Sequence, residues 1–139
     1  MQKKIQLLLS LFKTNKHIQA EILSRKLISN YPKNVFLYNL LGLSLINQKK
    51  INSAIKCYEE AINISSNYAP LFDNLGTAHK LTKNYLKAEY YYKKSIELDE
   101  KVAEPQNNLG NLYLLLNKNQ EAINCYENAI NINPKSFLS

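Results

Sequence analysis

The chain has 139 residues, a length typical of a single domain, and no apolar run reaches 18 residues, which excludes a transmembrane helix. Its hydrophobic content of 45% is ordinary for a globular protein. The formal net charge is +7, and residues 1–34 hold seven Lys or Arg against one Glu, so the positive charge is concentrated at the N-terminal end.

Helical periodicity and turn signals predict four helix pairs in chain order. The first helices of the pairs are expected near residues 2–14, 35–47, 69–81 and 103–116, and the second helices near 17–29, 51–64, 85–97 and 119–131. The N-terminal residues form an amphipathic first helix in this interpretation, because Ile5, Leu8 and Phe12 lie at helical spacing and no cleavage site of a signal peptide follows. Four prolines lie at or near the boundaries between pairs: Pro32, Pro70, Pro105 and Pro134.

A period of 34 residues organises the chain. All three glycines obey it, and so do the leucine before each glycine, an alanine in each second helix and a tyrosine four residues after that alanine. These positions are Gly42, Gly76 and Gly110; Leu41, Leu75 and Leu109; Ala54, Ala88 and Ala122; and Tyr58, Tyr92 and Tyr126. Small residues let two helices approach, so each glycine is expected to face the alanine of its partner helix.

This pattern resembles the tetratricopeptide repeat family, whose repeat reads aromatic, two residues, Leu-Gly, two residues, Tyr, then Ala, three residues, aromatic, and finally Pro. The matching residues are Tyr38, Leu41, Gly42, Leu45, Ala54 and Tyr58; Phe72, Leu75, Gly76, Ala88 and Tyr92; and Leu109, Gly110, Tyr113, Ala122, Tyr126 and Pro134. Gln106 and His79 depart from the pattern, as do Ser66 and Glu100 at positions often held by Pro. The resemblance implies an all-α fold, a right-handed α-solenoid of antiparallel helix pairs.

The same frame divides the chain into repeats of a single domain spanning 1–139. Residues 1–34 form a degenerate repeat, in which Leu8 replaces the glycine and Ser24 the aromatic residue, and three repeats follow at 35–68, 69–102 and 103–136. The segment from Pro134 repeats the junction that begins at Pro32, so the start of a further repeat is expected at 137. We therefore expect either a longer protein or a covered last helix, for which self-association is one route.

No constellation of catalytic or metal-binding residues is visible. The repeat uses all three glycines, which excludes a glycine-rich phosphate loop, and His17 and His79 belong to different repeats. Cys57 and Cys125 lie two repeats apart, too far for a disulfide, and their spacing does not fit a zinc site. The sequence predicts free thiols, a cytoplasmic location, no cofactor, no metal and no enzymatic activity.

The resemblance implies that six positions of each first helix line a concave groove. We call these residues the groove stripe: Phe36, Asn39, Leu40, Leu43, Ile46 and Asn47; Asp73, Asn74, Thr77 and Lys80; and Glu104, Asn107, Asn108, Asn111 and Leu114. An amide both donates and accepts hydrogen bonds, so asparagines here could pair with the backbone of an extended peptide, or could simply be solvated. Asn74 and Asn108 stand where O-GlcNAc transferases, which share this repeat, form a peptide-holding asparagine ladder. The predicted peptide-binding residues are Asn39, Leu43, Ile46, Asn74, Thr77, Asn108 and Asn111.

The leading hypothesis is a non-enzymatic scaffold that holds an extended segment or a helix of a partner protein. The alternative is the N-terminal region of a larger glycosyltransferase or sulfotransferase, which presents substrate proteins to it. A third hypothesis attaches the basic first repeat to nucleic acid or an anionic membrane, but aromatic residues are not interleaved with its charges, so specific nucleic-acid binding is not expected. Binding of chaperone tails through a carboxylate clamp is also not expected, because Glu104 stands where the clamp needs Lys.

Overall fold

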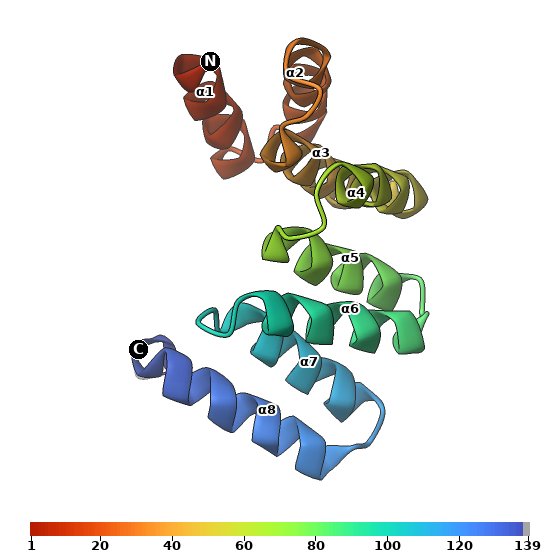
Figure 1. Ribbon diagram of the computed structural model, residues 1–139, viewed down its shortest axis with the longest axis vertical. Helices are drawn as coiled ribbons and strands as arrows, with labels where there is room; N and C mark the ends of the chain where they lie inside the picture. The colour runs from red at the N-terminus through yellow and green to blue at the C-terminus, as the bar shows by residue number, and fades with distance from the viewer. Residues whose placement is uncertain (138–139) are drawn as a thin grey trace. The chain divides into compact units, whose positions relative to one another are not determined.

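The structure, a computed structural model, describes residues 1–137 and contains eight α-helices and no strand in that part of the chain. The helices are α1 (Gln2–Lys13), α2 (His17–Asn30), α3 (Val35–Asn47), α4 (Ile51–Ile64), α5 (Ala69–Leu81), α6 (Tyr85–Leu98), α7 (Glu104–Leu115) and α8 (Asn119–Ile132), followed by the 3-10 helix η1 (Pro134–Phe137) (Figure 1). Every predicted helix is confirmed, with ends that differ by one residue at most. The further repeat is expected to start at residue 137, where η1 ends, and the residues after it, 138–139, lie outside the described residues, so this expectation stays a prediction.

The chain forms two compact units, divided between Ser66 and Asn67. The first unit holds α1 to α4, and the second holds α5 to α8 and η1. Each unit has a core of its own, formed around Leu8, Leu27 and Leu37 in the first unit and around Leu109, Leu112 and Tyr113 in the second. The assignment of residues 1–139 to one domain of 34-residue repeats stays a prediction.

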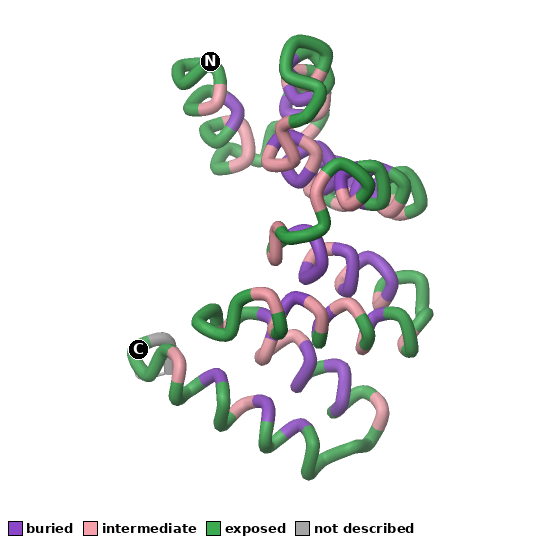
Figure 2. The backbone as a smooth tube through the Cα atoms, in the orientation of Figure 1, coloured by how far each residue is buried: buried purple, intermediate pink, exposed green. Residues whose placement is uncertain are grey.

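In three of the four pairs, α3–α4, α5–α6 and α7–α8, the first helix is the more buried member, whereas α1 is less buried than α2. In the second unit, α7 contacts both α6 and α8, and in the first unit α3 contacts both α2 and α4. A helix covered on two sides loses most of its exposed surface, and Figure 2 shows α5 buried along much of its length while α8 is largely exposed. The groove stripe therefore projects from helices whose positions are fixed on two sides.

The helices of each pair are joined by the same turn. Its left-handed residue recurs every 34 positions, at Asn15, Lys49, Lys83 and Asn117, with φ between 58° and 67°. The next residue donates its N–H to the carbonyl five positions back at 2.8–2.9 Å, as Lys50 does to Leu45. This bond satisfies a carbonyl that the end of the first helix would leave unpaired. Residues 1–34 thus share the turn although they lack the glycine.

The glycines permit a close approach, but to a different residue than predicted. A Cβ atom added at Gly42 would lie 2.2 Å from Cε1 of Tyr58, and the corresponding closest distances are 2.7 Å for Gly76 to Tyr92 and 2.8 Å for Gly110 to Tyr126. The sequence analysis expects each glycine to face the alanine, and the atoms nearest to the added Cβ belong instead to the tyrosine ring. The alanine is nevertheless fully buried in every repeat, at Ala20, Ala54, Ala88 and Ala122.

In the degenerate first repeat the large side chain lies on the first helix and the small one on the second helix, the reverse of the other repeats. Leu8 stands at the glycine position and Ser24 at the tyrosine position, and both are fully buried. The bulk that the second helix supplies in the other repeats is supplied here by the first helix, which preserves the packed volume. The Ser24 hydroxyl has no hydrogen-bond partner among the described residues, whereas Ser95, also buried, donates to the carbonyl of Ala69 at 2.9 Å.

Candidate peptide-binding surface

The predicted site residues of the first unit lie on α3 and are mostly covered. Asn39 is buried, with only 6% of its surface exposed. Leu43 is half-buried and packs against the core around Leu8 and Leu37, and Ile46 is half-buried as well. Leu43 therefore contributes part of its side chain to the interior, and the surface that the three residues offer to a ligand is small.

In the second unit the predicted residues lie on the adjacent first helices α5 and α7. Asn74, Thr77 and Asn108 are half-buried, and Asn111 is exposed. Asn108 Nδ2 donates to Asp73 Oδ1 at 2.9 Å, which links the stripe of α7 to that of α5. The structure therefore brings the stripe residues of these two helices together.

Two tyrosines of the recurrent position also reach this stripe. The hydroxyl of Tyr92 shares a hydrogen bond of 2.9 Å with Thr77 Oγ1, and the hydroxyl of Tyr126 donates to Asn111 Oδ1. The ring of each tyrosine thus lies over the glycine of its repeat. Its hydroxyl contacts the groove-stripe side chain that directly follows that glycine in the sequence. The ring holds the helix pair together and its hydroxyl orients a candidate binding residue.

Asp73 is a functional candidate that sequence reasoning did not select. Only 6% of its surface is exposed, and its carboxylate receives one hydrogen bond, from Asn108. Burial raises the pKa of the Asp73 carboxyl to about 6, the Asn108 hydrogen bond opposes the rise, and the charge of Glu104 adds to it. The only signal in the sequence is an acidic residue at a stripe position where the repeats 35–68 and 103–136 have Asn39 and Asn107.

A small pocket of about 80 Å³ opens beside Asp73. We call it the Asp73 pocket; it is lined by Ala69, Pro70, Asp73, Ser95, Asp99, Val102, Glu104 and Pro105. Its walls combine apolar side chains with three carboxyl groups, two of which, Asp99 and Glu104, are on exposed residues. The described residues contain no group of three His, Cys, Asp or Glu side chains that could hold a metal ion.

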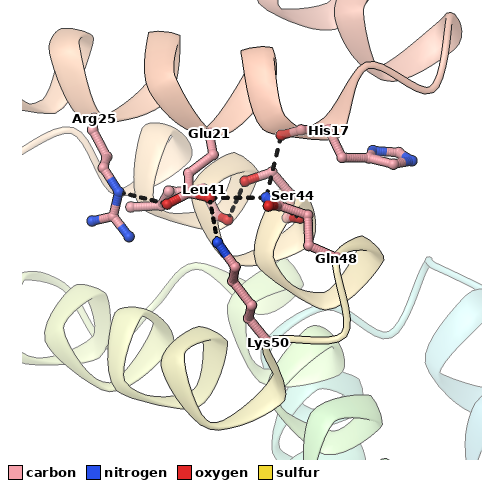
Figure 3. A network of polar contacts seen from close by, with 7 residues as sticks. All are labelled: His17, Glu21, Arg25, Leu41, Ser44, Gln48 and Lys50. Atoms are coloured by element: carbon pink, nitrogen blue, oxygen red, sulfur yellow. Dashed lines mark hydrogen bonds and ion pairs between the residues drawn. The ribbon is translucent and has the colours of Figure 1, made fainter.

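The first unit contains a polar network at the contact between α2 and α3. Gln48 Nε2 donates to Glu21 Oε1 at 2.9 Å and to the carbonyl of Ser44 at 3.0 Å, and Lys50 and Arg25 form ion pairs with Glu21 (Figure 3). Burial raises the pKa of Glu21, but these hydrogen bonds outweigh it, and the net shift is downward. Since both carboxylate oxygens are engaged, this network is a structural connection between neighbouring repeats.

Both histidines are explained by packing. His79 is buried, and its ring stacks on Tyr91 with the centroids 5.4 Å apart and the planes 12° from parallel. His17 lies beside Phe12, and its Nδ1 is 3.3 Å from the amide nitrogen of Asn47. The interpretation of His79 as a packing residue is confirmed.

Both cysteines are free thiols, as predicted, and both are buried. Cys57 Sγ lies 3.2 Å from the carbonyl oxygen of Tyr38, and burial raises the pKa of this thiol to about 12. Burial also raises the pKa of Cys125. A nucleophilic cysteine needs a lowered pKa, so neither thiol is suited to that role.

Comparison with known proteins identifies the family. The sequence profile of the tetratricopeptide repeat matches residues 34–101 and 67–135, which is most of the chain. The chain belongs to the tetratricopeptide repeat family. Among curated proteins it is 37% identical over 62 residues to the uncharacterized protein ycf37 of Porphyra purpurea, and the match covers 45% of this chain and 36% of that protein. The chain therefore spans only about a third of the length of this relative.

Two solved structures show the same tetratricopeptide fold. The thermophilic TPR protein TTC0263 of Thermus thermophilus superposes with a TM-score of 0.87 at 22% identity, over 93% of this chain and 72% of that chain. MamA of Desulfovibrio magneticus RS-1 superposes with a TM-score of 0.80 at 17% identity, over 98% and 76% of the two chains. The fold is accordingly an all-α helical-repeat solenoid. In the described residues no helix is long and apolar enough to cross a membrane.

Proposed function

We propose that this tetratricopeptide repeat chain is a non-enzymatic interaction scaffold that holds an extended segment of a partner protein along its groove stripe. The observation that carries the proposal is the pairing of α5 and α7, which places Asn74, Thr77, Asn108 and Asn111 on two first helices in contact. Amide side chains at such a surface can pair with peptide backbone whatever the side chains of the peptide are.

The hydrogen bonds within the protein support this role by orienting the amides. Tyr126 holds the oxygen of Asn111, which leaves the N–H donors of this exposed side chain for a ligand. Asp73 holds the nitrogen of Asn108, which leaves the Asn108 oxygen to accept. The two side chains thus offer a donor and an acceptor in fixed orientations, and a fixed binding group loses less conformational entropy when a ligand binds.

The first unit has a smaller part in the proposal. Leu43 and Ile46, members of the groove stripe on α3, are only half-buried, so each offers some apolar surface, while the buried Asn39 offers little. We therefore propose Leu43 and Ile46 as an apolar contact surface of the first unit, and we propose the amide-lined surface of α5 and α7 in the second unit as the main binding site. The free, buried cysteines fit the reducing cytoplasm, where we place the scaffold.

No observation supports the alternative in which the module presents substrates to a larger glycosyltransferase or sulfotransferase, and we do not propose it. Self-association remains a second use of the surface of α8. Ile123 and Ile130 of that helix are 48% and 42% exposed, which gives a second copy an apolar face to contact.

The proposal is tested by selecting extended peptides from a random displayed library against the full chain. The affinity of a selected peptide is then measured by calorimetry for the unaltered chain and for Asn108→Ala and Asn111→Ala. Each substitution removes a hydrogen bond to the peptide and should weaken binding roughly fivefold. Asn124→Ala and Asn131→Ala, exposed amides of α8 outside the stripe, are the controls and should bind as the unaltered chain does. Equal affinity in all four variants would remove the stripe from the function.

A further inference from the structure

Asp73 is a buried carboxylate without a cationic partner. Only 6% of its surface is exposed, it receives one hydrogen bond at Oδ1 from Asn108, and no Lys, Arg or His of the described residues lies within ion-pair distance of it. Buried carboxylates are normally paired with a cation, because burial removes the water that stabilises the charge. The free chain therefore holds a negative group that a positive ligand would stabilise.

The pocket around Asp73 has the composition that fits a long cationic side chain. Ala69, Pro70, Val102 and Pro105 supply apolar walls, and Asp73 supplies the charged end. A lysine or arginine side chain has the complementary make-up, with an aliphatic stem and a positive head. The described residues contain no cluster able to hold a metal ion, which favours an organic cation over a metal.

We propose that the Asp73 pocket binds a lysine or arginine side chain of the partner segment. The inference rests on the proposed function, because Asp73 and Glu104 belong to the same groove stripe as Asn108 and Asn111. It also specifies the chemical features of the partner. The partner is an extended segment that carries a basic residue at one position and whose backbone is bound by the amide side chains of the stripe. Glu104 contributes attraction at the rim, where water screens it, and Asp73 contributes the desolvated contact.

The ionisation of Asp73 gives the interaction a pH dependence. The charged and titratable groups that face Asp73 are Glu104 of α7 and Tyr92 of α6, with Asp99 at the pocket rim. The pKa of Asp73 is about 6, raised by burial and by the charge of Glu104, so the carboxylate is ionised at pH 7.5 and protonated at pH 5. Binding of a cationic side chain is expected to weaken as the pH falls through 6.

The test uses the full, isotope-labelled chain and two blocked peptides, acetyl-Ala-Ala-Lys-Ala-Ala-amide and its analogue with norleucine in place of lysine. Backbone amide resonances are followed by NMR during each titration at pH 7.5. The lysine peptide should shift the signals of Asp73, Val102 and Asn108 and should bind at least about fivefold more tightly than the norleucine peptide. Asp73→Asn should remove this difference, and Glu104→Gln, a change at an exposed residue, should reduce it. Glu127→Gln on the exposed surface of α8 is the matched control and should retain it.

The outcomes separate the two proposals. If both peptides shift Asn111 and bind equally, the pocket inference is overturned and the groove function stands. If neither peptide shifts any stripe residue, the groove function fails, and the pocket inference fails with it. Spermidine is titrated as a third ligand. If it shifts the pocket signals and the lysine peptide does not, the cation is a free polyamine, and the assignment to a peptide side chain is wrong.

Discussion

The glycine at each helix contact is matched to a tyrosine ring, and the three contacts differ in how much a methyl group would disturb them. At Gly42 the added Cβ would overlap Tyr58, a fully buried ring, at 2.2 Å. At Gly110 the corresponding distance is 2.8 Å, and Tyr126 is only half-buried, so its ring has room to move. The same substitution therefore has different consequences at equivalent positions.

We expect Gly42→Ala to lower the free energy of unfolding by about 2 kcal/mol, because a buried ring must shift and this outweighs the higher helix propensity of alanine. Gly110→Ala should change it by less than about 1 kcal/mol, since propensity and a small ring movement nearly cancel. Urea unfolding followed by circular dichroism measures both values. Equal losses in the two variants would contradict the role assigned to the buried ring.

Asp73→Asn should stabilise the chain in a pH-dependent way. The pKa of Asp73 is raised from 3.8 to about 6 in the folded state, so ionisation costs more there than in the unfolded chain. This cost is fully present above about pH 6 and disappears below about pH 4, and stability therefore falls as the pH rises between these values. At pH 7.5 the amide should gain about 3 kcal/mol, and at pH 3.5 close to nothing, in urea titrations. A gain that does not change with pH would show that the charge is not its cause.

At the level of single residues the sequence predicted positions better than contacts. The period located each glycine at a helix contact, because spacing determines which face of a helix a residue occupies. It did not predict that Tyr58 would cover Gly42, nor that Asn108 would bond to Asp73. These contacts depend on side-chain rotamers and on which neighbouring repeat covers a position. The sequence of a single repeat carries no information about either.

The four helix-joining turns all require a left-handed residue, and the chain uses lysine in two of them. Lysine has a Cβ and adopts positive φ at a cost of roughly 1 kcal/mol, whereas glycine does so freely. Lys49→Gly and Lys83→Gly should therefore each raise the free energy of unfolding by about 0.5–1 kcal/mol. Asn117→Gly should gain less, because asparagine tolerates this conformation. Lys50→Gly is the control: its φ is −91°, and glycine there should give no gain. Thermal and urea unfolding of the four variants compares them directly.

The helices themselves were predictable to within a residue, and the repeat that departs most from the pattern shows why. Residues 1–34 lack the recurrent glycine and the recurrent tyrosine of the repeat, yet they keep the fully buried Ala20 and the left-handed Asn15. The exchange that puts Leu8 and Ser24 in the buried positions preserves volume without preserving residue type. Helix formation follows from apolar periodicity, which such an exchange leaves unchanged. A pattern defined by residue identity is lost in the same exchange.

On the scale of the whole chain, the division into two units was not predicted. A uniform 34-residue period contains no marker for a boundary between such units, and the sequence therefore indicated one domain. The units nevertheless carry related final helices: Ala54, Ile55, Cys57, Tyr58 and Ala61 of α4 have identical counterparts 68 residues later in α8. One consequence is that each unit contains one buried cysteine, Cys57 in the first and Cys125 in the second.

These two thiols can report whether the units open separately. Repeat proteins are stabilised by contacts between neighbouring elements, so a core substitution should weaken mainly the unit that contains it. Leu112→Ala, within the core cluster that includes Cys125, should speed the labelling of Cys125 by a disulfide reagent at least about tenfold in mild urea, and that of Cys57 less than about twofold. Leu37→Ala, in the core of the first unit, should reverse the preference. Mass spectrometry of digested samples measures the two rates in one experiment. Equal acceleration of both thiols by either substitution would mean that the chain unfolds as a single cooperative unit.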